Sequence, residues 1–460
     1  MSVTRPIAWR RGAFLLACAL APLAAPAQGL RFLQAYEAAR AYDPGYRAAA
    51  YQRDALLEGQ QIARGNLLPQ VGLVASASSS EGWRHFANSL NQKVELPLDY
   101  SSPQVTLSVR WPLIHLEGLA AVDQAKAQAE LAEQQFRADG LNLLDRLGMA
   151  YLELLAARET HRLASLQVEA AEVVAAQAVR READGEGTRV LTARDTASLE
   201  LARSRVRDAL TQLEISREGV RRLTGLNAFV DPDLPPDLLP GPLFPADFDE
   251  WMDLALRSNP LLRAREWAVE AAAAQVRRDR AGHAPRLDLV GSVTQSRNDA
   301  LSTIGQSSHL RTLGLQLQVP LFSGGTVSAT VRQSQARFHV AEEELRREHE
   351  QLRLELTRLW QQMTSSRVRV LSLVEAVDAS TLALKGSQRT LAEGLSTAAD
   401  DASLRSADID LRRQLAQTRL ELIQARLRLQ IRAGLPAADA AAGLDALWPM
   451  QKPTTEGAAS

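Results

Sequence analysis

The side chains able to carry chemistry are few and scattered. A helix would point Asp408 and Asp410, which stand two residues apart, to different faces. Gly185-Glu186-Gly187 has neither the preceding strand nor the further glycines of a phosphate-binding loop. The seven histidines show no metal-ligand spacing: His85, His115, His161, His283, His309, His339 and His349. The sequence therefore predicts no enzyme, no metal site and no cofactor.

The composition favours long helices. Charged residues make up 23% of the chain and the formal net charge is −1, so no overall basic field indicates nucleic acid as a partner. Aromatic residues are only 5%, while Ala, Leu, Arg, Glu and Gln dominate, as in long helices and coiled coils. Taken alone, this composition is that of a large soluble helical bundle.

Residues 1–27 are predicted to be a secretory signal peptide. A basic start precedes the apolar run Ala13–Leu23, and Ala25-Pro26-Ala27 has the small residues of a cleavage site. Cleavage after Ala27 would leave no cysteine, which excludes disulfides and thiol catalysis. The alternative is lipoprotein processing at Cys18, which would leave an unusually short apolar core.

Two segments have the period-2 pattern of strands with one apolar and one polar face. They cover 105–111 and 313–319. In the first half, a strand predicted at 71–78 and a polar loop at 79–102 come before 105–111. In the second half, a strand predicted at 287–293 and a polar loop at 295–308 come before 313–319. The residues expected on the apolar, lipid-facing side are Leu107, Val109, Leu315 and Leu317. Those expected on the polar, lumen-facing side are Thr106, Ser108, Arg110, Gln316 and Gln318.

The remaining pattern is helical and duplicated. Sevenfold apolar ladders run without proline or glycine from 326 to 385, and a similar run covers 119–184 with soft breaks at Gly140 and Gly148. Landmarks in the two halves differ by a constant 209 positions, as between Tyr151 and Trp360. We expect repeats at 28–228 and 250–435, a proline-rich linker at 229–249 and a flexible C-terminal tail at 436–460.

Strands with one apolar face need a partner for that face, and lipid provides one. A strand of nine to eleven residues crosses a bilayer, provided that every backbone group is paired in a closed barrel. Four strands cannot close, whereas three chains would give twelve strands. A dimer would give eight, with an interior already filled by side chains. The predicted fold is therefore an α+β membrane protein: a trimeric twelve-stranded outer-membrane β-barrel continued by a long α-helical coiled-coil tunnel.

Five motifs in this order resemble the TolC-type outer-membrane channel proteins. They are Asn66–Val71, Trp111-Pro112-Leu113, Ala150-Tyr151-Leu152, Gly282–Leu289 and Val319–Gly325. The resemblance covers nearly the whole chain after residue 27. It implies a homotrimer in the outer membrane of a Gram-negative cell, with its tunnel in the periplasm. It also implies docking with an inner-membrane ABC transporter or other pump through a periplasmic adaptor (membrane fusion) protein.

The family narrows its tunnel entrance with aspartates on the last helix pair. The resemblance carries this role onto Asp400, while the second position falls on Ser403 and Asp401 stands where the family has a hydrophobic residue. Asp400 and Asp401 are thus candidate periplasmic gate residues. They are equally interpreted as acidic caps of the last helix, predicted at 403–433. The positions that latch the closed entrance in the family are Leu391 and Ser396 here, so that latch is not expected.

Two functions within the channel class, and one outside it, fit these patterns. We expect the exit duct of a type I secretion system, which passes a protein to the exterior, because the mature chain starts directly at its first helix. The alternative is the outer-membrane channel of a small-molecule efflux pump. A soluble periplasmic coiled-coil scaffold without a pore is the interpretation outside this class, and membrane fractionation separates it from the others.

The strand register is directly testable. Asp at Leu315 or Leu107 should reduce the amount of protein in the outer-membrane fraction far more than Asp at Gln316. A charge on the lipid face of a barrel costs up to about 2–4 kcal/mol near the midplane, less for Asp than for Arg or Lys, whereas lumen positions tolerate polarity. Equal losses at both faces would mean that the register is shifted by one residue, because such a slip exchanges the faces.

Overall fold

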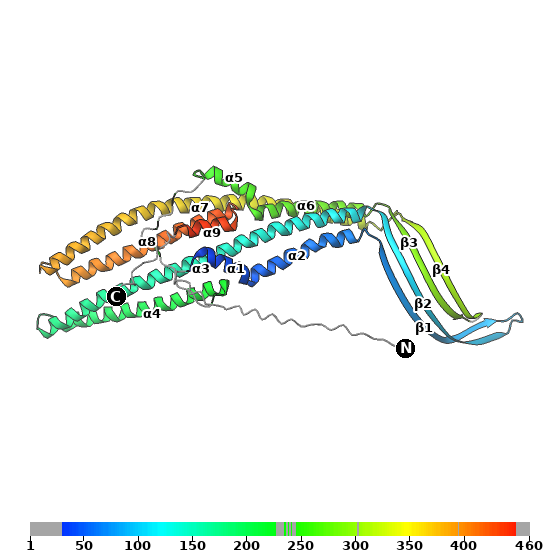
Figure 1. Ribbon diagram of the computed structural model, residues 1–460, viewed down its shortest axis with the longest axis horizontal. Coiled ribbons are helices and arrows are strands. Elements are labelled where there is room, and N and C mark those ends of the chain that lie inside the picture. Colours follow the sequence, from blue (N-terminus) through cyan, green and yellow to red (C-terminus); the bar gives the residue numbers. More distant parts are fainter. Residues whose placement is uncertain are drawn as a thin grey trace, which may run out of the picture.

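The computed structural model has a long helical part and a sheet at one end of it (Figure 1). The predicted signal peptide, most of the predicted linker at 229–249 and Gly394 lie outside the described residues. The described residues are 30–226, 234–235, 238, 241, 245–300, 303–393 and 395–447.

The helices occur in an order that is nearly repeated. A short and a medium helix come before each pair of strands, and a long and a shorter helix come after it. At 68 and 67 residues the two long helices, α3 and α7, each extend about 100 Å. The bounds are α1 Phe32–Tyr42, α2 Pro44–Gly65, α3 Leu116–Ala183, α4 Arg189–Thr224, α5 Phe248–Ser258, α6 Pro260–Ala281, α7 Thr326–Ala392, α8 Ala398–Arg432 and α9 Ala437–Asp445.

The four strands form one antiparallel sheet in the order β1-β2-β3-β4. β1 and β4 are its edges, and neither pairs with a further strand in the described part of the chain. The strands are β1 Gln70–Ala87, β2 Lys93–His115, β3 Arg286–Ala300 and β4 Thr303–Gln318. The antiparallel order follows from two short hairpin connections and from the return of the chain through the long helices.

The prediction of nine- to eleven-residue strands and polar loops was wrong. The strands have 18, 23, 15 and 16 residues, so most of 79–102 and 295–308 is strand. In 79–92 and 295–308 polar and charged residues occupy both faces, which removes the alternation from which a strand is recognised. Apolar and polar residues do alternate at 93–96, but Pro97 interrupts this pattern, and a proline within such a run argues against a central strand. Likewise α3 runs through Gly140 and Gly148 without a break, and α8 begins five residues earlier than predicted.

The predicted flexible tail at 436–460 is also corrected, over 437–447. Helix α9 buries Ala440, Ala441 and Leu444 against the rest of the chain. Its last residue, Asp445, accepts a hydrogen bond from the Phe32 amide at 3.1 Å. An alanine-rich sequence carries little periodic signal, so this docking is visible only in the structure.

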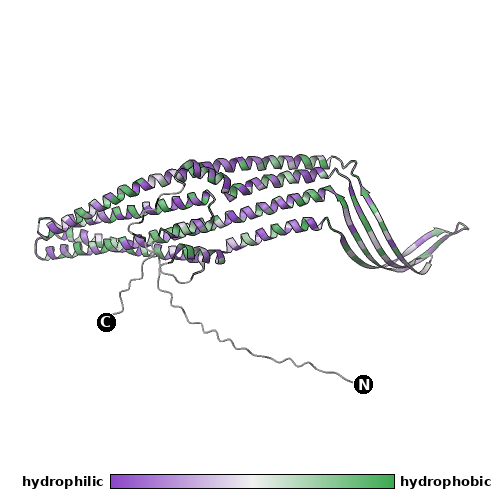
Figure 2. Ribbon diagram, turned by 45° about the horizontal axis from the view of Figure 1, so that its top comes forward, coloured by the Kyte–Doolittle hydropathy of each residue, from purple (hydrophilic) through white to green (hydrophobic). Residues whose placement is uncertain are grey.

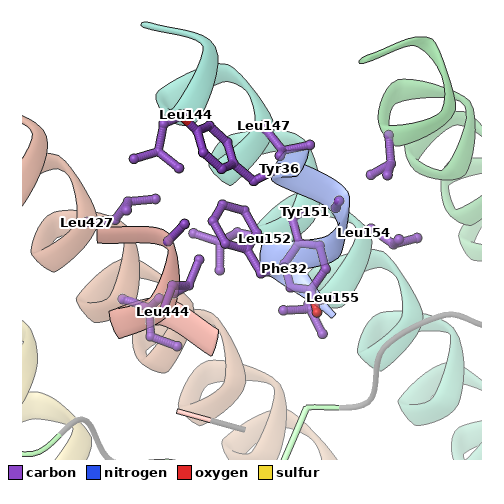
Figure 3. Close-up of a cluster of buried hydrophobic side chains, with 14 of the residues drawn as sticks. Phe32, Tyr36, Leu144, Leu147, Tyr151, Leu152, Leu154, Leu155, Leu427 and Leu444 are labelled. Atoms are coloured by element: carbon purple, nitrogen blue, oxygen red, sulfur yellow. The ribbon is translucent and has the colours of Figure 1, made fainter. Parts of the chain in front are cut away.

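The core lies midway along the helices, as two clusters. The first joins α1, α3, α8 and α9 and is shown in Figure 3. At its centre the ring of Tyr151 packs edge-on against Phe32, with ring centroids 5.3 Å apart. The Tyr151 hydroxyl donates to the Leu30 carbonyl at 2.8 Å, and burial raises the pKa of Tyr151. The second cluster surrounds Trp251 and Leu356, between α5, α7 and α8.

Away from these clusters the helices form a single layer. Near the free tips the neighbours run in the order α4, α3, α8, α7, and near the sheet in the order α2, α3, α6, α7 (Figure 1). Because only one layer exists, the outer helices keep one side uncovered: no residue of the fully described α2 is buried. None of the helices in the described ranges contains an apolar run long enough to cross a bilayer.

Asp43 gives a test of how the helices are held together. Its carboxylate caps α2 by accepting from the Tyr46 amide at 2.7 Å, and it lies 3.0 Å from an Nη atom of Arg146 on α3. Burial raises the pKa of Asp43, but the bonds from Arg146 and Tyr46 lower it by more, so the pKa lies below its usual value. The stabilisation is therefore complete above the unfolded-state pKa and is lost as pH falls through the folded-state pKa.

Asp43→Asn should lower the free energy of unfolding by about 1–2 kcal/mol at neutral pH, because it keeps the cap and removes the charge opposite half-exposed Arg146. Asn259, which caps α6 in the second half, shows that Asn performs the capping. The measurement is urea unfolding in detergent against pH. The difference should shrink in acid, and the exposed control Asp54→Asn should change little. An undiminished difference in acid would contradict the ion-pair account.

Candidate channel lining and tip site

The strand register sorts the sheet into two chemically different faces. Directly opposed residues share a face, so the pairs Leu107↔Val293 and Leu289↔Leu315 place β2, β3 and β4 in one frame. The four residues predicted to face lipid all fall on one side, and the five predicted to face the lumen fall on the other. We call these sides the apolar face and the polar face. Which of them meets lipid stays a prediction.

The residues of the apolar face form a band across all four strands. Its members on the four strands are Val71, Leu73, Leu107, Val109, Trp111, Leu287, Leu289, Val293, Leu313, Leu315 and Leu317. On β4 this face becomes polar at Arg311, which opposes Val293; from Leu317 to Arg311 the strand rises about 20 Å, or about 15 Å along the axis of a tilted barrel. Leu313 is 78% exposed and Leu315 is 65% exposed, so nothing in the described part of the chain covers this band.

The polar face is rich in hydroxyl groups, and two pairs of them contact each other across strands. The hydroxyl oxygens of Thr106 and Thr294 are 3.2 Å apart, and those of Ser296 and Ser308 are 2.8 Å apart. Figure 2 shows polar and apolar residues interspersed along each strand. Such a face suits contact with water, and the opposite face suits contact with hydrocarbon.

At the far end of the helices Asp400 caps α8. The Thr397 hydroxyl donates to an oxygen of Asp400 at 2.7 Å, and the Asp400 amide donates to that hydroxyl at 3.2 Å. The same Asp400 oxygen accepts from the Thr397 amide at 3.2 Å, which completes a capping box. These bonds from the Thr397 side chain and backbone hold the pKa of Asp400 below its usual value. The capping interpretation of Asp400 is confirmed, and its role as a gate stays a prediction.

Asp401 has a different environment. It is buried, it accepts from the Ser387 hydroxyl of α7 at 3.2 Å, and it lies 3.1 Å from Nε of Arg405. Its charge is therefore offset within the chain. Of the two residues, only Asp400 presents an exposed carboxylate that is not paired with a cation in the structure.

The tip also contains a second buried carboxylate that sequence reasoning missed. Asp408 is buried and lies 2.7 Å from Nε of Arg412, which in turn donates to Thr381 on α7 at 2.9 Å. Asp401 and Asp408 occupy the same sevenfold row as three buried leucines, Leu415, Leu422 and Leu429. This sevenfold spacing is the signal in the sequence from which the burial of Asp408 could have been predicted. Towards the tip the α7–α8 contact thus changes from apolar to hydrogen-bonded, with both ion pairs lying within α8, whereas the neighbouring Asp410 is exposed.

No group of three His, Cys, Asp or Glu side chains converges as a metal site in the described ranges. The corresponding helical hairpin of the first half, formed by α3 and α4, does not repeat the acidic pair Asp400 and Asp401. Its second helix, α4, begins with Arg189. The chemistry of the molecule is therefore that of two sheet faces and one charged tip.

Comparisons with known proteins agree on one family. Residues 35–226 and 251–434 match the family model described as outer membrane efflux protein. The alkaline protease secretion protein AprF of Pseudomonas aeruginosa is 29% identical over 403 residues, which cover 86% of this chain and 81% of that protein. The proteases secretion protein PrtF of Dickeya chrysanthemi is 30% identical over 394 residues, which cover 84% of each chain.

Among solved structures, the outer-membrane channel OprN superposes with a TM-score of 0.74. The match covers 88% of this chain and 91% of that one at 21% identity, so it shows a shared fold. The predicted resemblance to TolC-type channel proteins is confirmed by these findings together.

Ion selectivity tests the gate hypothesis. If several copies bring Asp400 together at a narrow tip, the pore should prefer cations and be blocked by multivalent cations from the tip side. Replacing Asp400 and Asp401 by Ala should reduce the cation-to-anion permeability ratio by at least about twofold in planar bilayers. Asp400→Ala alone should give most of the change, because Arg405 offsets Asp401.

Thr397→Ala is the matched control for this experiment, because it removes the cap and keeps both carboxylates. It should lower stability and leave ion preference unchanged. If the double Ala variant also keeps its ion preference, Asp400 serves only as a cap.

Proposed function

The chain belongs to the outer membrane efflux protein family, and we propose that three copies of it form the outer-membrane exit duct of a type I secretion system. In this proposal the three sheets close into a twelve-stranded barrel, and the helices continue as a periplasmic tunnel. An inner-membrane ABC transporter delivers a polypeptide to the tunnel through a periplasmic adaptor protein. The polypeptide then leaves the cell through the barrel.

The observation that carries the proposal is the pair of open edges along the whole molecule. One edge consists of β1, α2 and α4, and the other consists of β4 and α7. The edge strands have similar lengths, 18 and 16 residues, and run in opposite directions. Joining β4 of one copy to β1 of the next therefore continues the antiparallel sheet without changing its pattern.

The outer helices have apolar residues free for the same junction. On α4 these include Val190, Leu201 and Ile215, and on α7 they include Val340, Val368 and Leu382, all exposed in the single chain. A closed ring buries both sets, whereas an open chain leaves them in water. Three copies give twelve strands, an even number within the range of outer-membrane barrels.

Protein export is favoured over small-molecule efflux by the relatives. AprF and PrtF, whose names state the secretion of proteases, match this chain over more than four fifths of its length. OprN matches at 21% identity, where only the fold is informative. Efflux remains the second candidate, because the family description itself names it.

Deletion of the gene tests the function. The deleted strain should lose a polypeptide from its culture medium and retain it inside the cell, and the wild-type gene should restore its release. Sensitivity to dyes and antibiotics should change little. The purified protein in detergent should have a mass close to three times that of the 50.2 kDa chain less its leader.

Two results would contradict this proposal. Unchanged secreted proteins together with increased drug sensitivity would assign the chain to an efflux pump. Recovery of a monomer in the soluble fraction would exclude both channel functions and leave a scaffold.

A further inference from the structure

The charges of the polar face are strongly unbalanced. Along the described strands this face carries three arginines, Arg84, Arg110 and Arg286, and one carboxylate, Asp288. Asp288 is buried and lies 2.9 Å from Nε of Arg286, so these two charges offset each other. Arg110 remains as the cation at the level of the apolar band.

Arg110 lies beside an unfilled hollow. The hollow has a volume of about 480 Å³ and its floor consists of small residues, because Gly72, Ser108 and Ser292 share one cross-strand row. Within the described part of the chain no carboxylate lies within ion-pair distance of Arg110. Residues directly opposite it on the neighbouring strands are Gln70 and Val290, which are uncharged.

The hollow also has hydrogen-bonding groups. Its lining includes the hydroxyls of Ser108, Ser292 and Thr312, and the Ser108 hydroxyl donates to the Gly72 carbonyl at 3.4 Å, a long contact that is easily exchanged. A guanidinium next to hydroxyls above a floor without bulky side chains has the composition of a carboxylate site.

We propose that Arg110 and this hollow bind carboxylate groups inside the barrel, so that three copies form a cationic girdle through which the substrate passes. This inference rests on the proposed function, because it requires the polar face to line the lumen of a trimer. The carboxylates belong either to acidic side chains of an exported polypeptide or to small organic anions. In both cases the girdle draws negative charge into the exit.

The girdle and the tip act on different stretches of the path. Asp400 lies at the far end of helices about 100 Å long, far beyond the screening length of about 8 Å at physiological salt. The two charged zones are therefore electrically independent. Removing the charge of Asp400 at the tip should therefore reveal the anion preference of the Arg110 girdle.

Selectivity of the reconstituted protein tests the inference. In an Asp400→Ala background the channel should prefer chloride over potassium at about 0.1 M salt. Adding Arg110→Gln should lower the chloride-to-potassium permeability ratio about fivefold, which follows from three unit charges at roughly 10 Å. The difference in permeability ratio between the two variants should vanish at about 1 M salt, where the screening length is only about 3 Å.

Two further variants serve as controls. Arg110→Lys keeps the charge and should keep the selectivity. Arg311→Gln removes the same charge from the apolar face, where Arg311 opposes Val293, and should leave selectivity unchanged. Gln already occurs at several positions of the polar face, such as Gln104 and Gln316, so Arg110→Gln is compatible with folding.

Blockers identify the source of the carboxylate. Polyglutamate or citrate, added on the barrel side, should reduce the current through the wild-type channel, and Arg110→Gln should raise the half-blocking concentration about fivefold. Block by polyglutamate alone assigns the girdle to polypeptide, and block by citrate alone assigns it to small anions. Any block of the current by polylysine should not depend on Arg110.

Trimeric channels that conduct normally, and whose selectivity and block are the same in the wild type and in Arg110→Gln, would overturn this inference and leave the proposed function intact. Failure to obtain any trimeric channel from the wild-type chain would overturn both. Loss of selectivity in Arg311→Gln instead of Arg110→Gln would overturn the inference as well, because it would show that the opposite face lines the lumen.

Discussion

The structure depends on the unpaired backbone groups at the two edges of its sheet. An N–H or C=O group without a partner costs several kcal/mol in hydrocarbon, so a four-stranded sheet with an apolar face is not stable there by itself. The same edges continue as the uncovered sides of α2, α4 and α7. In the proposed ring, joining β4 of one copy to β1 of the next would therefore pair the sheet edges and cover the outer helices together.

Duplication explains how one chain meets this constraint. The order of helices and strands occurs twice, with α2 and α6 both 22 residues long and α3 and α7 differing by one residue. Each copy of the repeat contains one β-hairpin and one pair of long helices, so the proposed trimer would consist of six similar units. The units differ in detail: β1 and β2 extend beyond β3 and β4, and a charged Asp43 takes the capping place of Asn259.

Sequence patterns predicted the parts of the fold in which apolar and polar residues recur at a regular spacing. The alternation of Leu107 and Leu315 with polar neighbours assigned both faces consistently, because a pleat has a period of two residues. The hairpin ends at 79–102 were missed because polar residues occupy both faces over 79–92, and because Pro97 interrupts the alternation at 93–96. Helix α9 was missed because alanines dock without a periodic stripe. At the tip, the capping alternative for Asp400 is confirmed, the gate alternative stays a prediction, and the pairing of Asp401 with Arg405 and Ser387 required coordinates.

A duct must attract its substrate without retaining it, and the polar face combines these requirements. Entry needs some favourable interaction, and exit needs each interaction to be weak or shared among sites. The hydroxyls of Thr106 and Thr294 pair with each other, as do those of Ser296 and Ser308, and their remaining sites offer only neutral hydrogen bonds that water can replace. Arg286 is occupied by Asp288. Arg110 is the exception, and if the polar face lines a hydrated lumen, as we propose, its attraction for a carboxylate is modest and screened by salt. An isolated cation on an otherwise neutral surface therefore fits transit better than tight binding.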